Sequence, residues 1–224
     1  ATTGYYNTAV GTFSLDALTT GYNNAALGQV SLSSLTTGAR NTATGYGSLQ
    51  MQTTACNNTA SGYRAARCTT TGGNNTGMGV SVLYENTTGD LNSAFGIYAL
   101  ASNTTADNNT AVGACSLYAN TTGTNLVGVG FKALVANTTG SSNTAVGMAA
   151  LANNTTAEHI VAIGTCSLYA NTGNRNTAVG ANSLKANTTG ACNVAVGYNA
   201  LDSNTTGHKN EAFGNYALQA NTTG

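Results

Sequence analysis

The chain has 224 residues, of which only 6 % are charged, and its formal net charge is zero. Typical globular proteins contain about 25 % charged residues. A neutral chain lacks the basic surface that binds nucleic acids or anionic membranes, and its longest apolar runs are only a few residues, too short to cross a bilayer. We therefore expect no nucleic-acid partner and no membrane insertion.

A repeat of 17 residues runs along the chain. Each repeat contains a marker glycine that closes an Asn-Thr-Ala-Val-Gly-like motif, and one step between markers is 16 residues because Asn171-Thr172-Gly173 replaces the usual Asn-Thr-Thr-Gly. Below, position −1 is the residue before the marker and +4 the fourth after it. The markers are Gly11, Gly28, Gly45, Gly62, Gly79, Gly96, Gly113, Gly130, Gly147, Gly164, Gly180, Gly197 and Gly214.

These markers indicate a single repeat array over residues 1–224, expected to be a segment of a longer fibre. Its 13 repeats begin near residues 5, 22, 39, 56, 73, 90, 107, 124, 141, 158, 174, 191 and 208.

The columns of the repeat predict an all-β fold. Position −3 is mostly Thr, −2 is always Ala or Gly, −1 is mostly apolar, and +4 is Leu in 12 of 13 repeats. The period-two alternation indicates a strand, and 17 residues cannot hold two strands and a ten-residue helix. We predict a parallel β-solenoid (β-roll) with two short strands per repeat, at Thr-Ala-Val-Gly and Ala-Leu, whose core is formed by positions −1 and +4.

The small residue at position −2 predicts close approach by another surface. Examples are Ala111, Ala145 and Ala178. A stripe of small side chains along a strand favours lateral association, and the simplest closed form is a homotrimer; a filament is the other form of self-association expected.

A longer period of 51 residues is also present, for instance from Ala55 to Ala106 to Ala157. It has two interpretations. Either a block of three repeats was duplicated, or one coil of the solenoid contains three repeats, so that each repeat stacks on the third one along.

The motif of residues 143–147 and 176–180 resembles the repeats in the head domains of trimeric autotransporter adhesins, and the fuller unit Asn-Thr-Ala-Val-Gly-x-x-Ala-Leu-x-Ala-Asn-Thr-Thr-Gly is similar to repeats of phage tail-fibre-type proteins. The resemblance covers the whole chain. It implies a parallel β-roll that trimerises, located outside the cell, at a cell surface or on a virion.

Catalytic and metal-binding patterns are missing from the sequence. No Ser/His/Asp set, phosphate loop or paired-carboxylate motif is found, so we expect neither an enzyme nor a cofactor. His159 and His208 have no partner at metal-ligand spacing, and no metal site is predicted. Asp90 and Asp107 occupy one column of successive repeats, which fits either a weak cation site or solvated turn residues.

Two further features leave alternatives open. The five cysteines form no CxxC pair, but Cys56 and Cys68 share one repeat and are a candidate disulfide. The Asn-x-Thr sequons are either glycosylation sites or unmodified Asn ladders; they include Asn86, Asn103, Asn120, Asn137, Asn187, Asn204 and Asn221.

Tyrosines occupy variable columns that also accept Lys and Arg, and are therefore expected to face solvent. Exposed Tyr is typical of recognition surfaces, including those for cell-surface glycans; the alternative is stacking between neighbouring repeats. The candidates are Tyr84, Tyr98, Tyr118, Tyr169, Tyr198 and Tyr216.

These observations favour a structural or adhesive fibre shaft, a rigid repeat spacer with surface or glycan recognition. The alternatives are an ice-binding β-solenoid with Thr ladders and a glycosylated extracellular filament subunit. Thr44, Ser61 and Ala66 stand at the expected core columns, so the third and fourth repeats are expected to be the least stable.

Overall fold

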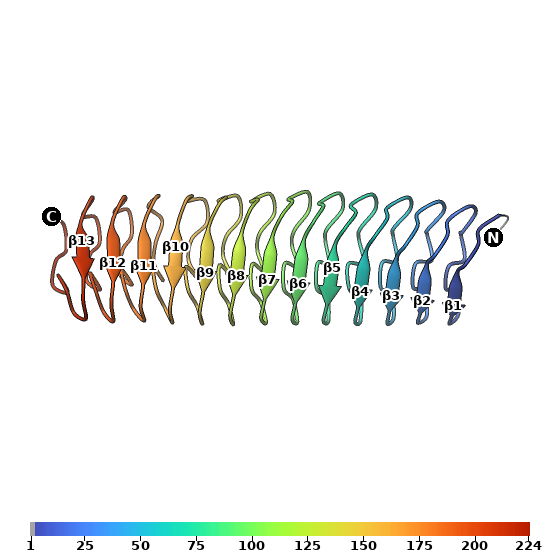
Figure 1. Cartoon of the computed structure of the whole chain (residues 1–224), viewed down its shortest axis with the longest axis horizontal. Helices are drawn as coiled ribbons and strands as arrows, with labels where there is room; N and C mark the ends of the chain where they lie inside the picture. Colours follow the sequence, from blue (N-terminus) through green and yellow to red (C-terminus); the bar gives the residue numbers. More distant parts are fainter. Residues whose placement is uncertain (1–2) are drawn as a thin grey trace. The chain divides into compact units, whose positions relative to one another are not determined.

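The computed structural model describes residues 3–224. They form two compact units, one ending at Asn109 and one beginning at Thr110. Each unit is a parallel β-solenoid, and no helix is present in residues 3–224. Within each unit, the strands follow one another in sequence order (Figure 1). The first unit contains β1 (Thr8–Val10), β2 (Ala25–Leu27), β3 (Thr42–Thr44), β4 (Thr59–Ser61), β5 (Thr76–Met78) and β6 (Ser93–Phe95). The second contains β7 (Thr110–Val112), β8 (Val127–Val129), β9 (Thr144–Val146), β10 (Val161–Ile163), β11 (Thr177–Val179), β12 (Val194–Val196) and β13 (Glu211–Phe213).

Successive strands pair in parallel, with equivalent positions of the repeat side by side. Thr42 pairs with Thr59 in the first unit, and Thr177 pairs with Val194 in the second. Each repeat therefore stacks on the next one, so one coil is one repeat and the three-repeat coil is ruled out. The predicted all-β parallel solenoid is confirmed.

The second predicted strand, at Ala-Leu, does not form. Positions +2 and +4 have positive φ, as at Cys115 (56°) and Leu117 (53°). The backbone there bonds alternately to the two neighbouring coils: Leu134 N–H donates to Ala150 O (3.0 Å), and Ala149 N–H donates to Phe131 O (2.9 Å). A left-handed conformation costs an L-residue about 1–2 kcal/mol, which burial of a Leu side chain, worth about 1.5–3 kcal/mol, offsets.

The strand side chains face the opposite way from the prediction. Ala111, Ala145 and Ala178 are fully buried inside their own coil, whereas position −1 points outward. Position −2 is small because the interior is narrow: a Cβ added to Gly128 would lie 3.1 Å from Leu117 Cγ. The expected burial of this column against another chain or another face is confirmed, and the face is the Leu column of its own chain. The column therefore gives no reason to infer lateral association.

Two Asn ladders complete the interior. At position −4, Asn41 Nδ2 donates to Asn24 Oδ1 (3.0 Å) and to Ala55 O (2.9 Å), while its Oδ1 accepts from Asn58 N–H (2.9 Å). At position +7, which is Asn from Asn86 onward, Asn103 Nδ2 donates to Asn86 Oδ1 of the preceding coil (2.7 Å) and to Ala106 O, three residues on (3.0 Å). The coil therefore holds a polar network beside its apolar core, and this network satisfies the buried turn carbonyls.

The 16-residue repeat interrupts the second ladder. Asn171 Nδ2 donates to Gly173 O (2.8 Å) within its own shortened turn, so Asn154 Oδ1 is buried without a hydrogen-bond partner. In complete repeats this oxygen accepts from the next coil, as Asn137 Oδ1 does from Asn154 Nδ2 (2.9 Å).

Inserting a Thr between Thr172 and Gly173 is expected to stabilise the chain by about 1 kcal/mol, because the missing hydrogen bond to Asn154 can then form. Urea unfolding followed by circular dichroism measures the change. The same insertion between Thr189 and Gly190, in a complete turn, is expected to destabilise the chain. Equal effects of the two insertions would show that the short turn is not the reason why Asn154 Oδ1 lacks a hydrogen-bond partner.

The expected weakness of the third and fourth coils stays a prediction, and only part of its sequence basis lies in the core. Thr44 and Ser61 lie on the outward side of their strands, half-buried, and leave no gap in the core. Ala66 does occupy the buried Leu position, and Thr69 Oγ1 in the same coil is buried without a partner. Cys56 and Cys68 are both free thiols, so the predicted disulfide between them is wrong.

Ala66→Leu is expected to stabilise the first unit by about 1–3 kcal/mol, since the added side chain fills the space between Leu49 and Leu83. The backbone is already suited, because φ is 48° at Ala66 and 49° at Leu49. Native-state hydrogen exchange of the fourth coil measures the gain. The reverse change, Leu49→Ala, is expected to destabilise the unit by about 2–5 kcal/mol. Faster exchange of the fourth coil in Ala66→Leu would contradict the expected gain in packing.

Candidate functional site

Side chains at position −6, on the outside of the coil, hold neighbouring coils together. The carboxylate of Asp90 accepts from Gly73 N–H (2.6 Å), and that of Asp107 accepts from Asp90 N–H (2.7 Å). His208 Nδ1 accepts from Ala191 N–H in the same way (3.0 Å). Each side chain thus satisfies the backbone of the preceding coil, which accounts for the aspartate pair without a cation. Within residues 3–224, no three His, Cys, Asp or Glu residues are grouped so as to hold a metal ion.

The part of the chain from residue 3 onward has no helix long and apolar enough to cross a membrane.

The sequon asparagines form the buried ladder at position +7. Six of them are fully buried: Asn86, Asn103, Asn120, Asn137, Asn187 and Asn204. Their Nδ2 atoms donate inside the coil, as Asn137 does to Asn120 Oδ1 (2.9 Å) and Gly140 O (3.0 Å), and Asn221 at the end of the same column is half-buried. A glycan is attached to this same Nδ2 atom, so the folded coil has no room for glycans at the six buried sites. At these six sites the ladder interpretation therefore replaces glycosylation.

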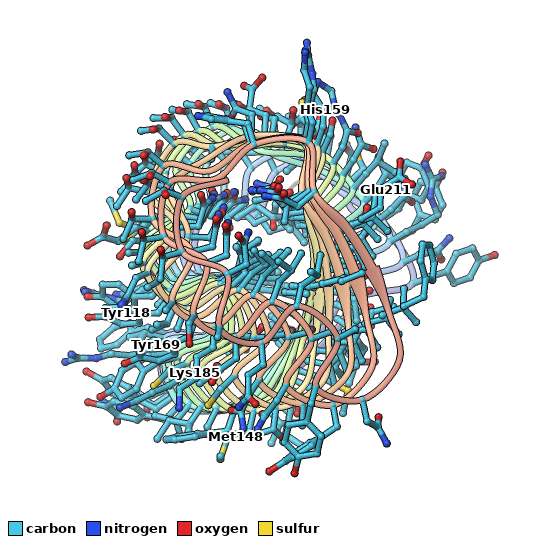
Figure 2. The ribbon with its side chains drawn as sticks, turned by 90° about the vertical axis from the view of Figure 1, so that its left-hand side faces the viewer. Tyr118, Met148, His159, Tyr169, Lys185 and Glu211 are labelled. Carbon is cyan, nitrogen blue, oxygen red and sulfur yellow. The ribbon has the colours of Figure 1, made fainter. Side chains whose placement is uncertain are left out.

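The candidate tyrosines lie on the outer surface, in three separate columns. Tyr118 and Tyr169 belong to position +5 and are 43 % and 38 % exposed. Figure 2 shows these two and Lys185 pointing out of one side of the coil, with Glu211 of β13 on the opposite side. The similarly exposed tyrosines are Tyr98, Tyr198 and Tyr216.

Some tyrosines contact each other or a neighbouring coil. The rings of Tyr198 and Tyr216 meet edge to face at 5.4 Å between centroids. Tyr84 is half-buried, and its hydroxyl accepts from Arg67 Nη1 (3.0 Å). The structure therefore gives both interpretations a basis: some tyrosines stabilise the ladder, and others are displayed.

The outward face of the strands, formed by positions −3 and −1 and called here the sheet face, was missed at the sequence level. Its position −1 carries large apolar side chains. In the first unit Val10, Leu27, Met78 and Phe95 are 38–55 % exposed. In the second unit Val112, Ile163 and Phe213 are 38–69 % exposed, and the remaining four valines of this position are half-buried: Val129, Val146, Val179 and Val196. The only charged residue of the sheet face in either unit is Glu211.

No family model, curated protein or solved structure matches this chain. Its function is therefore inferred from its own surfaces.

The Thr-Thr pairs of the turns form a second regular surface. The hydroxyl of the first Thr donates to the carbonyl of the equivalent Thr one coil on, as Thr36 does to Thr53 O and Thr138 to Thr155 O, both at 3.0 Å. The second Thr, such as Thr37 or Thr139, is exposed. One of the two rows thus has its hydroxyl hydrogen committed to the ladder, and one row is fully open to water.

Proposed function

We propose that the chain is a structural and adhesive shaft of an extracellular, cell-surface or virion fibre, which self-associates through the sheet face and has no catalytic role. The observation that carries this proposal is the row of exposed apolar side chains at position −1.

Two physical arguments support an interface there. Parallel sheets are normally covered on both faces. Here the chain itself covers only the inner face of its sheet, and the sheet face is left uncovered. Contiguous exposed apolar surface in a water-soluble molecule marks an interaction site. The scarcity of charge on this face removes the desolvation penalty that burial of a charged surface would carry.

The partner that fits best is a second copy of the same chain. Its sheet face has the same distance between coils, so apolar rows of two copies match at every coil. A homotrimer whose axis follows the stacking direction keeps equivalent coils at one height, as in the adhesin heads that the repeat resembles. Tyr118 and Tyr169, on the opposite side to Glu211 in Figure 2, then stay on the outside for surface or glycan recognition.

Sedimentation equilibrium of the purified chain tests the proposal. We expect a trimer at micromolar concentration, with no change on raising the salt concentration because the contact is apolar. A monomer at concentrations up to about 1 mM would exclude an interface of this size.

Ice binding is a second candidate, favoured by the exposed Thr row of the turns, which repeats regularly from coil to coil. Thermal hysteresis of the purified chain tests it. Hysteresis that disappears in Thr139→Val and Thr156→Val would support this function, and freezing at the equilibrium point with no change of ice-crystal shape would exclude it.

A further inference from the structure

Two arginines of the fourth coil lie together without an anionic partner. Arg67 Nε donates to Gln50 Oε1 (2.7 Å), and its Nη1 donates to the Tyr84 hydroxyl (3.0 Å). The guanidinium carbon of Arg64 lies 5.0 Å from the centroid of the Tyr63 ring, and Arg64 Nε is buried without a hydrogen-bond partner. Two of the seven basic residues of a neutral chain are thus held in place by neutral groups.

Exposed aromatic surface adjoins these cations. The rings of Tyr46 and Tyr63 stack at 5.4 Å with 15° between their planes, and the two residues are 42 % and 46 % exposed. The hydrogen bond to Tyr84 raises the pKa of Arg67. Glu85, the acidic residue of the next coil, acts electrostatically on Cys68 and forms no ion pair with either arginine.

We propose that this cluster binds an anionic saccharide, a chain of sugars that carry carboxylate or sulfate groups. The cluster consists of Tyr46, Gln50, Tyr63, Arg64, Arg67 and Tyr84. The cluster would be one recognition element displayed by the shaft. The proposal therefore rests on the display role proposed above but not on self-association.

The chemistry of the cluster selects this ligand class. Guanidinium groups bind carboxylate and sulfate oxygens through paired N–H donors. The exposed carbon surface of the tyrosine rings offers apolar contact to sugar C–H groups, and the tyrosine hydroxyls bond sugar hydroxyls. Nucleic acid is disfavoured, because its affinity comes from many phosphate contacts, and the fourth coil has only two cations.

The test measures binding of four defined probes by isothermal titration calorimetry: an oligomer of glucuronic acid, a sulfated oligosaccharide, a neutral glucose oligomer and a single-stranded DNA oligonucleotide. We expect one or both acidic saccharides to bind and the glucose oligomer not to bind. The acidic probe that binds more tightly shows whether the cluster prefers carboxylate or sulfate groups.

Arg64→Gln and Arg67→Gln are each expected to weaken this binding at least about tenfold, the loss of one charge-assisted contact. Arg64→Gln removes no hydrogen bond within the protein and should leave the thermal unfolding temperature unchanged. The matched control is Lys132→Gln: Lys132 lies 5.2 Å from the Phe131 ring in the second unit, with no second cation in its coil, and its removal should leave binding intact.

Four results would overturn the proposal: no binding of either acidic saccharide, equal binding by the Arg64→Gln variant, equally tight binding of the glucose oligomer, or DNA binding as tight as that of the saccharides, which would indicate a general anion patch. None of these results bears on the oligomeric state measured by sedimentation, so failure here and failure of the fibre interface are distinguishable.

Discussion

Replacing Val146 and Val179 together by lysine is expected to dissociate the assembled chain into monomers and to lower the association constant on the order of 100-fold or more. Both side chains lie at position −1 of the sheet face, half-buried and pointing outward. In an assembly, each lysine would be buried opposite an apolar row with no carboxylate to pair with, which is strongly unfavourable. Sedimentation equilibrium measures the effect.

The control moves the same charges to the other side of the coil. Tyr118→Lys and Tyr169→Lys lie in position +5, whose side chains point away from the side that carries Glu211 (Figure 2). These variants should keep the oligomeric state of the parent chain. Dissociation by the control pair, or retention of the assembly by the Val146/Val179 pair, would place the interface elsewhere.

Asn137→Ala is expected to destabilise the second unit by about 3–5 kcal/mol. The substitution removes three buried hydrogen bonds: those that Asn137 Nδ2 donates to Asn120 Oδ1 (2.9 Å) and Gly140 O (3.0 Å), and the one that Asn154 Nδ2 donates to Asn137 Oδ1 (2.9 Å). Each unsatisfied buried group costs about 1–3 kcal/mol, and local relaxation recovers part of the total.

Hydrogen exchange of the neighbouring backbone amides measures this loss without assuming that the repeat array unfolds in one step. Asn153→Ala is the matched control, because Asn153 is exposed and its replacement should change stability by less than about 0.5 kcal/mol. Similar protection factors in the two variants would show that the ladder contributes little.

The sequence predicted that equivalent positions of the repeats pair in parallel, because its period is almost uniform. It left open whether each repeat stacks on the next or on the third one along, and the pairing of Thr42 with Thr59 settles this in favour of the next repeat. The direction in which the strands face was predicted wrongly. Period-two alternation separates two faces but does not say which is inside, and position −1, as the more apolar column, was placed there. Position −2 held the relevant signal, because the coil is so narrow that even a Cβ added to Gly128 would lie only 3.1 Å from Leu117 Cγ.

The absence of the second strand could not be read from residue types. Positions with positive φ usually carry Gly or Asn, whereas here they carry residues such as Leu134 at 53° and Lys132 at 57°. Burial of the leucines and hydrogen bonds to both neighbouring coils impose this backbone, and neither is visible in a single repeat.

The outer surfaces were partly predictable. Exposure of Tyr118 and Tyr169 followed from a column that also accepts Lys185. The sequons could be interpreted in two ways until the structure placed their side chains inside the coil. The contacts of Arg67 with Gln50 and Tyr84 join position +5 of three successive coils, and they become apparent only once single repeats are known to stack directly.

Disulfide formation between copies tests most directly the claim that position −2 faces inward and position −1 faces a second chain. In a chain whose five cysteines are replaced by Ser, Val146→Cys is compared with Ala145→Cys after mild oxidation of mixed isotope-labelled and unlabelled protein. We expect disulfides that join a labelled to an unlabelled chain at Val146→Cys, because equivalent coils meet at one height. We expect none at Ala145→Cys. Interchain disulfides at Ala145→Cys, or a free thiol at Val146→Cys in every chain, would contradict this claim.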